Sequence, residues 1–288
     1  MGVIGHFITR KFLHRQSQIH VSQYPQLACF AFDQITHSIH LEGRYENDIL
    51  GFLAASIFPN LPSGGTCLDI GANIGNHSLA FSGHFDRVIS FEPHPRTFRL
   101  LEVNGDLVDN VTPINLGLSS TAGTFEIVED KLNIGASSLE RTLDPKGAAI
   151  SFKVDRLDDL DLMKTMGPIT FMKLDIEGHE AEALRGAQDT IATHGPVVMI
   201  EVLPHEIEQG DAEALKVLRG FGYTYFYEGV EKGRLGTLPR RRKKWARAFR
   251  SLISGKRPSK TEVLNPISQL EARSYPMILC TKTALNAA

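Results

Sequence analysis

A polar run follows an apolar segment in the stretch FMKLDIEGHE, which ends at Glu180. Lys173, Asp175, Glu177 and His179 stand at alternate positions, so an extended chain would present them on one side, toward a ligand. Carboxylates and an imidazole brought together can exchange protons with a substrate or bind a metal ion. A plainer interpretation is that the acids favour a helix start and the histidine lies in a solvated loop. The chain offers no separate second set of ligands, so we predict no metal site.

A second group of small and acidic residues lies in the stretch LDIGANIGNHSL. Asp69, Gly71, Asn73 and Gly75 stand at alternate positions at the end of an apolar run. Glycines let the chain turn sharply and bring backbone N–H groups close to a ligand, and an acid can order the loop or meet a cation. Glu92, 23 residues beyond Asp69, ends the next apolar run, where a carboxylate can accept hydrogen bonds from two ribose hydroxyls.

This combination suits two cofactors that contain adenosine, a nicotinamide dinucleotide and S-adenosylmethionine. The dinucleotide fingerprint G-x-G-x-x-G, begun at Gly71, would require glycines where Asn73 and Asn76 stand. The observed pattern D-x-G-x-N-x-G instead suits a smaller zwitterion without a pyrophosphate. We therefore predict S-adenosylmethionine as the cofactor, with a dinucleotide and a purely structural glycine turn as the alternatives.

Both groups require elements that end at the same edge of the fold. Short β-rich runs alternate with helical patterns, which predicts an α/β fold with a doubly wound, mostly parallel sheet and helices on both faces. We expect seven strands, at residues 66–70, 87–92, 112–116, 169–175, 197–202, 223–227 and 277–281, with helices that include residues 96–104, 180–193 and 212–220. Two more strand-like runs, GTFEIVE and ISFKVDRL, lie between residues 122 and 154. Ligands bind beyond the carboxyl ends of parallel strands.

A basic insertion at about residues 231–275 separates the last two expected strands, so either strand can depart from the parallel pattern. The formal net charge is −2, yet residues 231–260 hold twelve Lys or Arg and one acid, so the other 258 residues carry about −13. Aromatic residues among these charges predict a helix at residues 239–253 that lies on an anionic membrane surface or glycolipid. The alternative is a helix that packs its aromatic face on the rest of the protein. Nucleic acid is not expected as a partner, because no recognised binding fold accompanies the charge.

The cysteines and the apolar runs indicate where the protein resides. Cys29, Cys67 and Cys280 have no C-x-x-C spacing, and the last two lie in apolar runs, which predicts buried thiols in place of disulfides or a zinc site. No apolar run approaches the roughly 18 residues needed to span a bilayer, and the N-terminus lacks a signal-peptide pattern. We expect a cytoplasmic protein that can also associate with the inner face of the membrane through the basic insertion.

Several motifs, in their order along the chain, resemble the FkbM-type S-adenosylmethionine-dependent methyltransferases. They are YENDIL, LDIGANIGNHSL, ISFEPHPRTFRLLEVN, INLGLSS, GASSL, MKLDIEGHEAEALRGA and VVMIEVLPH. The match covers roughly residues 43–204, and the joint order is far more specific than any single motif. The resemblance implies a Rossmann-like class I methyltransferase sheet with an antiparallel final strand. It also implies O-methylation of a hydroxyl on a sugar, glycan or natural product.

The resemblance assigns some residues to the cofactor. It implies that the loop from Asp69 through Gly71 and Asn73 to Gly75 holds the methionine portion and that Glu92 accepts the ribose hydroxyls.

Two further positions match less distinctive motifs. Glu46 is similar to an upstream glutamate that meets the cofactor's ammonium or closes the pocket, although an acid at a helix start explains it equally. Ser137 and Ser138 in GASSL match a loop near the cofactor, and a flexible Gly/Ser turn also accounts for them.

The same resemblance places Asp175, Glu177 and His179 at the reacting end, since they match a D-x-E-G-x-E segment. The acceptor oxygen must lie in line with the methyl carbon and sulfur in a site shielded from water. His179 is expected as the general base because an imidazole titrates near neutral pH, with Glu177 or Asp175 orienting it or the acceptor hydroxyl.

The resulting prediction is a methyltransferase domain at residues 44–288, preceded by an N-terminal cap at residues 1–43 that covers the acceptor site or makes a dimer contact. The expected acceptor is a hydroxyl-bearing small molecule or glycan. The alternatives are a non-catalytic basic binding module on a degenerate methyltransferase fold and an NAD-dependent Rossmann enzyme.

Overall fold

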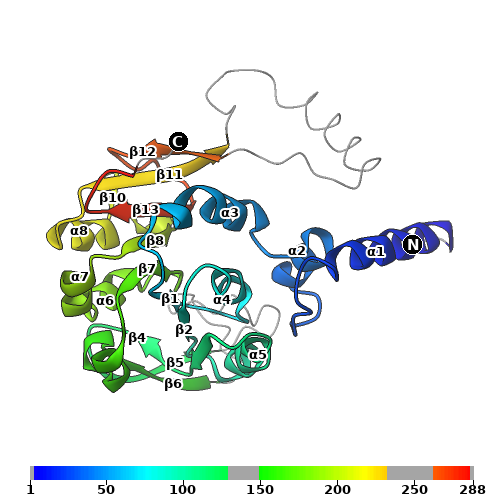
Figure 1. Cartoon of the computed structure of the whole chain (residues 1–288), viewed down its shortest axis with the longest axis horizontal. Coiled ribbons are helices and arrows are strands. Elements are labelled where there is room, and N and C mark those ends of the chain that lie inside the picture. Colours follow the sequence, from blue (N-terminus) through cyan, green and yellow to red (C-terminus); the bar gives the residue numbers. More distant parts are fainter. Residues whose placement is uncertain (1–2, 129–148, 232–261, 286–288) are drawn as a thin grey trace.

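An eight-stranded sheet forms the centre of the computed structural model, which describes residues 3–128, 149–231 and 262–285 (Figure 1). The strand order is β12-β11-β13-β8-β7-β1-β2-β3. The strands are β1 (Thr66–Ile70), β2 (Arg87–Phe91), β3 (Val111–Ile114), β7 (Ile169–Leu174), β8 (Val197–Val202), β11 (Tyr225–Glu231), β12 (Glu262–Pro266) and β13 (Tyr275–Thr281). The neighbours from β3 to β8 are parallel, and β13 is antiparallel to both β8 and β11.

The predicted α/β class and the mostly parallel sheet are confirmed, but the predicted number of seven strands is wrong. The eighth strand, β12, comes from the segment assigned to the basic insertion at residues 231–275 and pairs antiparallel with β11 at the edge of the sheet. Its sequence EVLNP ends in Asn265 and Pro266, two residue types that are rare in strands, so the pattern gave little strand signal.

Helices cover both faces of the sheet (Figure 1). They are α1 (Val3–His20), α2 (Gln34–Glu42), α3 (Asn47–Phe52), α4 (Asn76–Phe81), α5 (Pro95–Gly105), α6 (Glu180–Arg185), α7 (Gln188–His194) and α8 (Glu213–Gly220). The single helix expected at residues 180–193 is two helices. They separate next to Gly186, where a Cβ atom would stand 2.0 Å from the carbonyl oxygen of Ser119.

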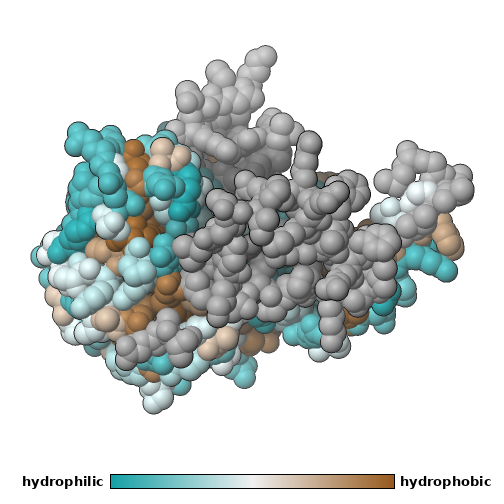
Figure 2. Space-filling view, turned by 90° about the horizontal axis from the view of Figure 1, so that it is seen from above, coloured by the Kyte–Doolittle hydropathy of each residue, from teal (hydrophilic) through white to brown (hydrophobic). Residues whose placement is uncertain are grey.

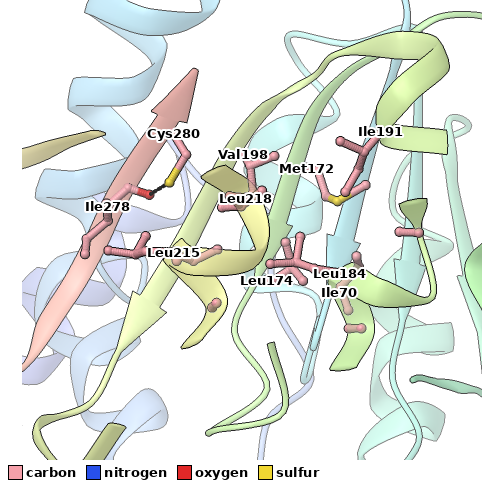
Figure 3. Packing of buried hydrophobic residues seen from close by; sticks show 14 of the residues in the cluster. Ile70, Met172, Leu174, Leu184, Ile191, Val198, Leu215, Leu218, Ile278 and Cys280 are labelled. Carbon is pink, nitrogen blue, oxygen red and sulfur yellow. Dashed lines mark hydrogen bonds between the residues drawn. The ribbon is translucent and has the colours of Figure 1, made fainter. Parts of the chain in front are cut away.

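The two faces of the sheet carry separate apolar clusters, because side chains alternate along each strand. On β1, Leu68 packs with the residues of α6, α7 and α8, whereas Cys67 packs with those of α3 and α4. Figure 3 shows the first cluster, in which the Cys280 thiol lies 3.9 Å from the carbonyl oxygen of Ile278. All three cysteines are free thiols, and Cys67 and Cys280 are buried, as the sequence predicts.

Short elements complete the fold around the main sheet. A three-stranded sheet joins β4 (Gly117–Leu118), β6 (Ala149–Asp155) and β5 (Gly123–Val128), so the two strand-like runs before residue 155 are confirmed. A two-stranded ribbon pairs β9 (Ile207–Glu208) with β10 (Asp211–Ala212). A π-helical turn (Leu53–Ile57) follows α3, and 3-10 turns occur at Phe58–Asn60, Leu157–Asp159, Asp161–Thr165 and Pro204–Glu206.

The N-terminal segment contacts the rest of the protein after α1, which extends away from the body (Figure 1). The Asn104 side chain accepts a hydrogen bond from the Ala28 N–H at 2.7 Å and donates to the Ala28 carbonyl at 2.9 Å. It also donates to the carbonyl of Ile74 at 2.7 Å, in the loop after β1. Asn104 therefore ties the segment before α2 to the loop for which we predict cofactor contacts.

In the view from above, an apolar band runs between groups of polar side chains on the part of the molecule away from α1 (Figure 2). Within the described residues, no helix has the length and apolar character needed to cross a membrane. Residues 239–253, for which we predict contact with an anionic surface, lie outside the described part of the chain.

The aromatic side chain of Phe171 is central to the second cluster and gives a test of the fold. It is fully buried, and its ring centroid lies 5.2 Å from that of Phe58 and 5.6 Å from that of Phe81. We expect Phe171→Ala to lower the free energy of unfolding by about 3–5 kcal/mol, because the cavity left behind cannot collapse fully. Phe32→Ala, at a side chain that is 91% exposed, should change it by less than about 0.5 kcal/mol in the same urea titration. Similar losses in the two variants would contradict this packing.

Candidate active site

A cavity of about 280 Å³ opens at the carboxyl ends of β1, β2, β7 and β8. The chain runs outward from β1 through β2 to β3 and then returns to β7 on the other side of β1. Such a reversal of strand order is where ligands bind in open α/β sheets. The ends of these strands, the segments that follow β1, β2 and β7, and the segment before α3 supply the polar groups of the cavity wall.

The loop after β1 requires glycine at Gly71. This residue has φ of +77°, and a Cβ atom would lie 2.0 Å from the carbonyl oxygen of Asp175. The N–H groups of Gly71 and Ala72 both donate to the carbonyl of Phe91, at 3.0 and 2.9 Å. Asn73 follows with φ of 51° and lines the cavity. The loop is therefore held between the ends of β2 and β7 with its backbone close to the cavity.

The carboxylate of Glu92 follows β2 and fixes the same loop. Its Oε2 accepts the N–H of Asn73 at 2.9 Å, and its Oε1 accepts the N–H of His94 at 2.9 Å. Burial raises the pKa of Glu92 to about 7, and the two backbone hydrogen bonds limit the rise. Each carboxylate oxygen keeps a second acceptor position, so Glu92 can also receive hydroxyl groups from a ligand in the cavity.

A buried lysine joins the ends of β1 and β7. Lys173 Nζ lies 3.2 Å from Asp69 Oδ1, 3.3 Å from Asp175 Oδ2 and 3.3 Å from the carbonyl oxygen of Gly71. Burial alone would lower the pKa of Lys173, but the charges and hydrogen bonds of Asp175 and Asp69 raise it above its ordinary value. Asp69 is fully buried, and its Oδ2 accepts the hydroxyl of Ser78 at 2.6 Å. Lys173 is thus a fixed positive charge between two carboxylates.

Asp175 and Glu201 lie side by side because β7 and β8 are in register, with Leu174 opposite Ile200. The two carboxyl groups share a hydrogen bond on the cavity wall. Burial, reinforced by the charge of Asp175, raises the pKa of Glu201 to about 9. Burial opposes ionisation of Asp175 too, but Lys173 holds the pKa of Asp175 below its ordinary value. At neutral pH the pair therefore holds one proton, on Glu201.

The segment before α3 closes another side of the cavity. The Asn76 side chain accepts a hydrogen bond from the N–H of Tyr45 at 3.1 Å and donates to the Tyr45 carbonyl at 3.0 Å. The neighbouring Glu46 has φ of 52°, and its carboxylate lies 3.2 Å from His77 Nε2. Asn76 stands where a dinucleotide fingerprint would need glycine, and here it positions Tyr45 and Glu46 at the cavity.

The turn after β7 is folded by Glu180, which is 1% exposed. Its carboxylate accepts the N–H of Ile176 at 2.8 Å and that of Gly178 at 2.9 Å, and burial raises its pKa to about 7. Glu177 and Gly178 adopt positive φ, so the extended spacing expected after Asp175 ends there. His179 directly precedes α6, and its Nε2 lies 3.0 Å from the Ser119 hydroxyl.

Comparison with known proteins identifies the fold's relatives. Residues 69–225, more than half of the chain, match the methyltransferase FkbM domain. The chain belongs to the FkbM methyltransferase family. This match begins at Asp69, near the end of β1, and includes the loop after β1 and the segments of the cavity wall that follow β2, β7 and β8.

Two similar proteins and one solved structure can be compared with this chain by sequence identity and by the share of each chain that is covered. The hexuronic acid methyltransferase AglP of Haloferax volcanii is 31% identical over 132 residues, which cover 46% of this chain and 53% of AglP. The methyltransferase sdnD of Sordaria araneosa is 27% identical over 198 residues, 57% of this chain and 76% of sdnD. The crystal structure of methyltransferase FkbM from Methylobacillus flagellatus KT is 23% identical, covers 48% of this chain and 33% of that one, and aligns with a TM-score of 0.34. The chain thus spans about half the length of AglP.

Most of the site residues that we predict from the sequence lie together on the cavity wall. They are Glu46, Gly71, Asn73, Glu92, Asp175, Glu177 and His179. Asp69 and Gly75 do not line it: Asp69 lies behind the loop against Lys173, and Gly75 directly precedes α4 with φ of 88°. Ser137 and Ser138 lie outside the described residues. Among the residues that the structure describes, no three His, Cys, Asp or Glu are placed to hold a metal ion.

Several residues that shape this cavity have contacts that sequence patterns alone do not reveal. Lys173 stood out as polar, but its partner Asp69 is 104 positions earlier, and only the pairing of β1 with β7 brings them together. Glu201 is an exception, because an acid at the end of the strand expected at residues 197–202 is predicted either to line the acceptor pocket or to cap the sheet, and it lines the cavity. The backbone contacts of Asn76 and Glu180 cannot be predicted from the spacing of residue types.

Lys173 gives a direct test of this arrangement. Lys173→Met should lower the free energy of unfolding by about 3–5 kcal/mol, because it leaves the fully buried Asp69 without its opposite charge. Lys164→Met, at a side chain 73% exposed, should cost less than about 1 kcal/mol in the same urea titration. Adding Asp69→Asn to Lys173→Met should restore part of the loss. A Lys173 variant as stable as the Lys164 variant would contradict the buried network.

Proposed function

We propose that this chain transfers a methyl group from S-adenosylmethionine to a hydroxyl group of a sugar, glycan or natural product. The observation that carries the proposal is the carboxylate of Glu92, placed after β2 on the wall of a cavity that the glycine loop also lines. A carboxylate in this position suits the two hydroxyls of an adenosine ribose. Membership of the FkbM family supports the reaction class.

The charges of the cavity wall fit this cofactor better than a dinucleotide. Five carboxyl groups line the cavity: Glu46, Glu92, Asp175, Glu177 and Glu201. Lys173, also on the wall, already contacts Asp69 and Asp175. Such a wall attracts a ligand with sulfonium and ammonium groups and opposes the negative charges of a pyrophosphate. The donor set and the glycine pattern therefore favour the same cofactor.

Bound S-adenosylmethionine supplies an electrophilic methyl group. The chain's own task is to hold the acceptor oxygen in line with that group and to exclude water. Glu92 and the Asn73 loop hold the cofactor, while the turn with Glu177 and His179 faces the acceptor. The imidazole of His179 can hydrogen-bond to a hydroxyl substrate and hold its oxygen toward the methyl group.

The relatives support the class of acceptor. AglP is described as a hexuronic acid methyltransferase, and sdnD as a methyltransferase. A sugar hydroxyl is therefore the first acceptor to screen, and O-methylation is the proposed outcome.

Glu92 provides the test of cofactor binding. Calorimetric titration with S-adenosylhomocysteine should show saturable binding that weakens at least about tenfold in Glu92→Gln, because an amide cannot accept two hydroxyls as a carboxylate does. Since the pKa of Glu92 is raised to about 7, binding should also weaken as the pH falls from 8 to 6, and less so in the variant. Glu102→Gln, on the exposed side of α5, is the matched control. NADH binding with no S-adenosylhomocysteine binding would identify a dinucleotide enzyme instead.

His179 provides the test of the reacting end. Once a screen of glycans with methyl-labelled cofactor gives an acceptor, His179→Ala should lower kcat/KM for that acceptor by about a hundredfold. Its affinity for S-adenosylhomocysteine should stay at the wild-type value, because Glu92 and the glycine loop are untouched. His14→Ala, at an exposed position on α1, should match the wild type. Unchanged turnover in His179→Ala would remove this residue from the reaction.

A further inference from the structure

Asp175 and Glu201 form a carboxyl pair whose two members have different surroundings. Asp175 contacts Lys173 at 3.3 Å, whereas Glu201 shares its hydrogen bond with Asp175 and is close to the further negative charges of Glu46 and Glu177. Both carboxyl groups lie on the cavity wall. The pair therefore keeps its proton on the member that lacks a cation.

Lys173 cannot serve both carboxyl groups. Its ammonium already lies within 3.3 Å of Asp69, Asp175 and the Gly71 carbonyl, which match its three N–H donors. The other groups that act on the pair are the Tyr45 phenol, which remains neutral because burial raises its pKa, and His77, whose charge would act on Asp175. A positive charge entering the cavity would thus favour ionisation of Glu201.

Methyl transfer to a hydroxyl removes the positive charge of the sulfonium and releases a proton, and a carboxyl pair can respond to both changes. The C–O bond forms as the C–S bond breaks, so the sulfonium becomes a neutral sulfide while the acceptor O–H bond gives up a proton. The site loses the positive charge of the sulfur, and a group in the site must accept the proton that leaves the hydroxyl. A carboxyl group that is ionised beside a sulfonium and regains its proton affinity as that charge disappears meets both needs.

We propose that Glu201, paired with Asp175, is the proton acceptor of the reaction: it releases its proton to solvent when S-adenosylmethionine binds and takes the hydroxyl proton as the methyl group moves. This inference rests on the proposed function. It leaves His179, whose Nε2 lies 3.0 Å from the Ser119 hydroxyl, to hold the acceptor. The pKa of Glu201, raised to about 9 by burial and by Asp175, agrees with a proton that stays on the pair until a cation arrives.

Proton release on ligand binding tests the inference without any acceptor. S-adenosylmethionine and S-adenosylhomocysteine differ only in the methyl group and its positive charge, so their difference isolates the sulfonium. Each is titrated calorimetrically into the full chain at pH 8 in phosphate and in Tris, and the dependence of the heat on the buffer gives the protons released. We expect wild-type protein to release up to about one proton more with S-adenosylmethionine. Its affinity relative to S-adenosylhomocysteine should rise up to about tenfold per pH unit.

Two variants complete the experiment. Glu201→Gln keeps the shape of the side chain and removes its titration, so the difference in proton release and its pH dependence should disappear. Glu208→Gln, an exposed glutamate seven positions later, should behave as the wild type. Equal proton release with both ligands in the wild type, or an unchanged difference in Glu201→Gln, overturns the inference. Failure of both ligands to bind overturns the proposed function and this inference with it, so the two failures are distinct.

Discussion

The buried ammonium of Lys173 is the interaction on which the rest of the cavity depends. It lies on β7, opposite Asp69 of β1, and contacts Asp69, Asp175 and the Gly71 carbonyl at 3.2 to 3.3 Å. A buried ion pair is weak evidence for stability, because desolvation of the charges offsets much of their attraction. Its clearer effect here is geometric. It holds together the ends of β1 and β7 and the loop that follows β1, at the point where the strand order of the sheet reverses.

The loops around this centre are held by single polar side chains that bind backbone groups. Glu92 binds the N–H groups of Asn73 and His94, Asn76 binds both backbone groups of Tyr45, and Glu180 binds the turn after β7. Among the described residues, five non-glycine residues have positive φ, and three of them line the cavity: Glu46, Asn73 and Glu177. Strained backbone persists only where surrounding contacts fix it, so these polar contacts keep the wall in shape.

Local patterns were sufficient for most of the sheet and insufficient wherever a distant contact decides the structure. The apolar runs at residues 66–70 and 197–202 are strands with the predicted bounds, since buried parallel strands are continuous apolar segments. The break between α6 and α7 was missed because it depends on the close approach of Gly186 to the Ser119 carbonyl. In the sequence, Asn76 indicates only that the dinucleotide fingerprint lacks a glycine, whereas in the structure its amide binds the backbone of Tyr45. Chemical type and spacing thus located the cavity, but strand register determines which residues meet in it.

Strand register also explains how two neighbouring carboxyl groups acquire opposite properties. Asp175 and Glu201 stand next to each other at the ends of β7 and β8, and both line the cavity. Lys173 is two positions before Asp175 on β7, so its side chain lies on the same face of the strand and reaches that carboxylate. In β8 the equivalent position is Met199, which brings no charge to Glu201. The lysine that joins β1 to β7 therefore also determines which carboxyl group carries the proton.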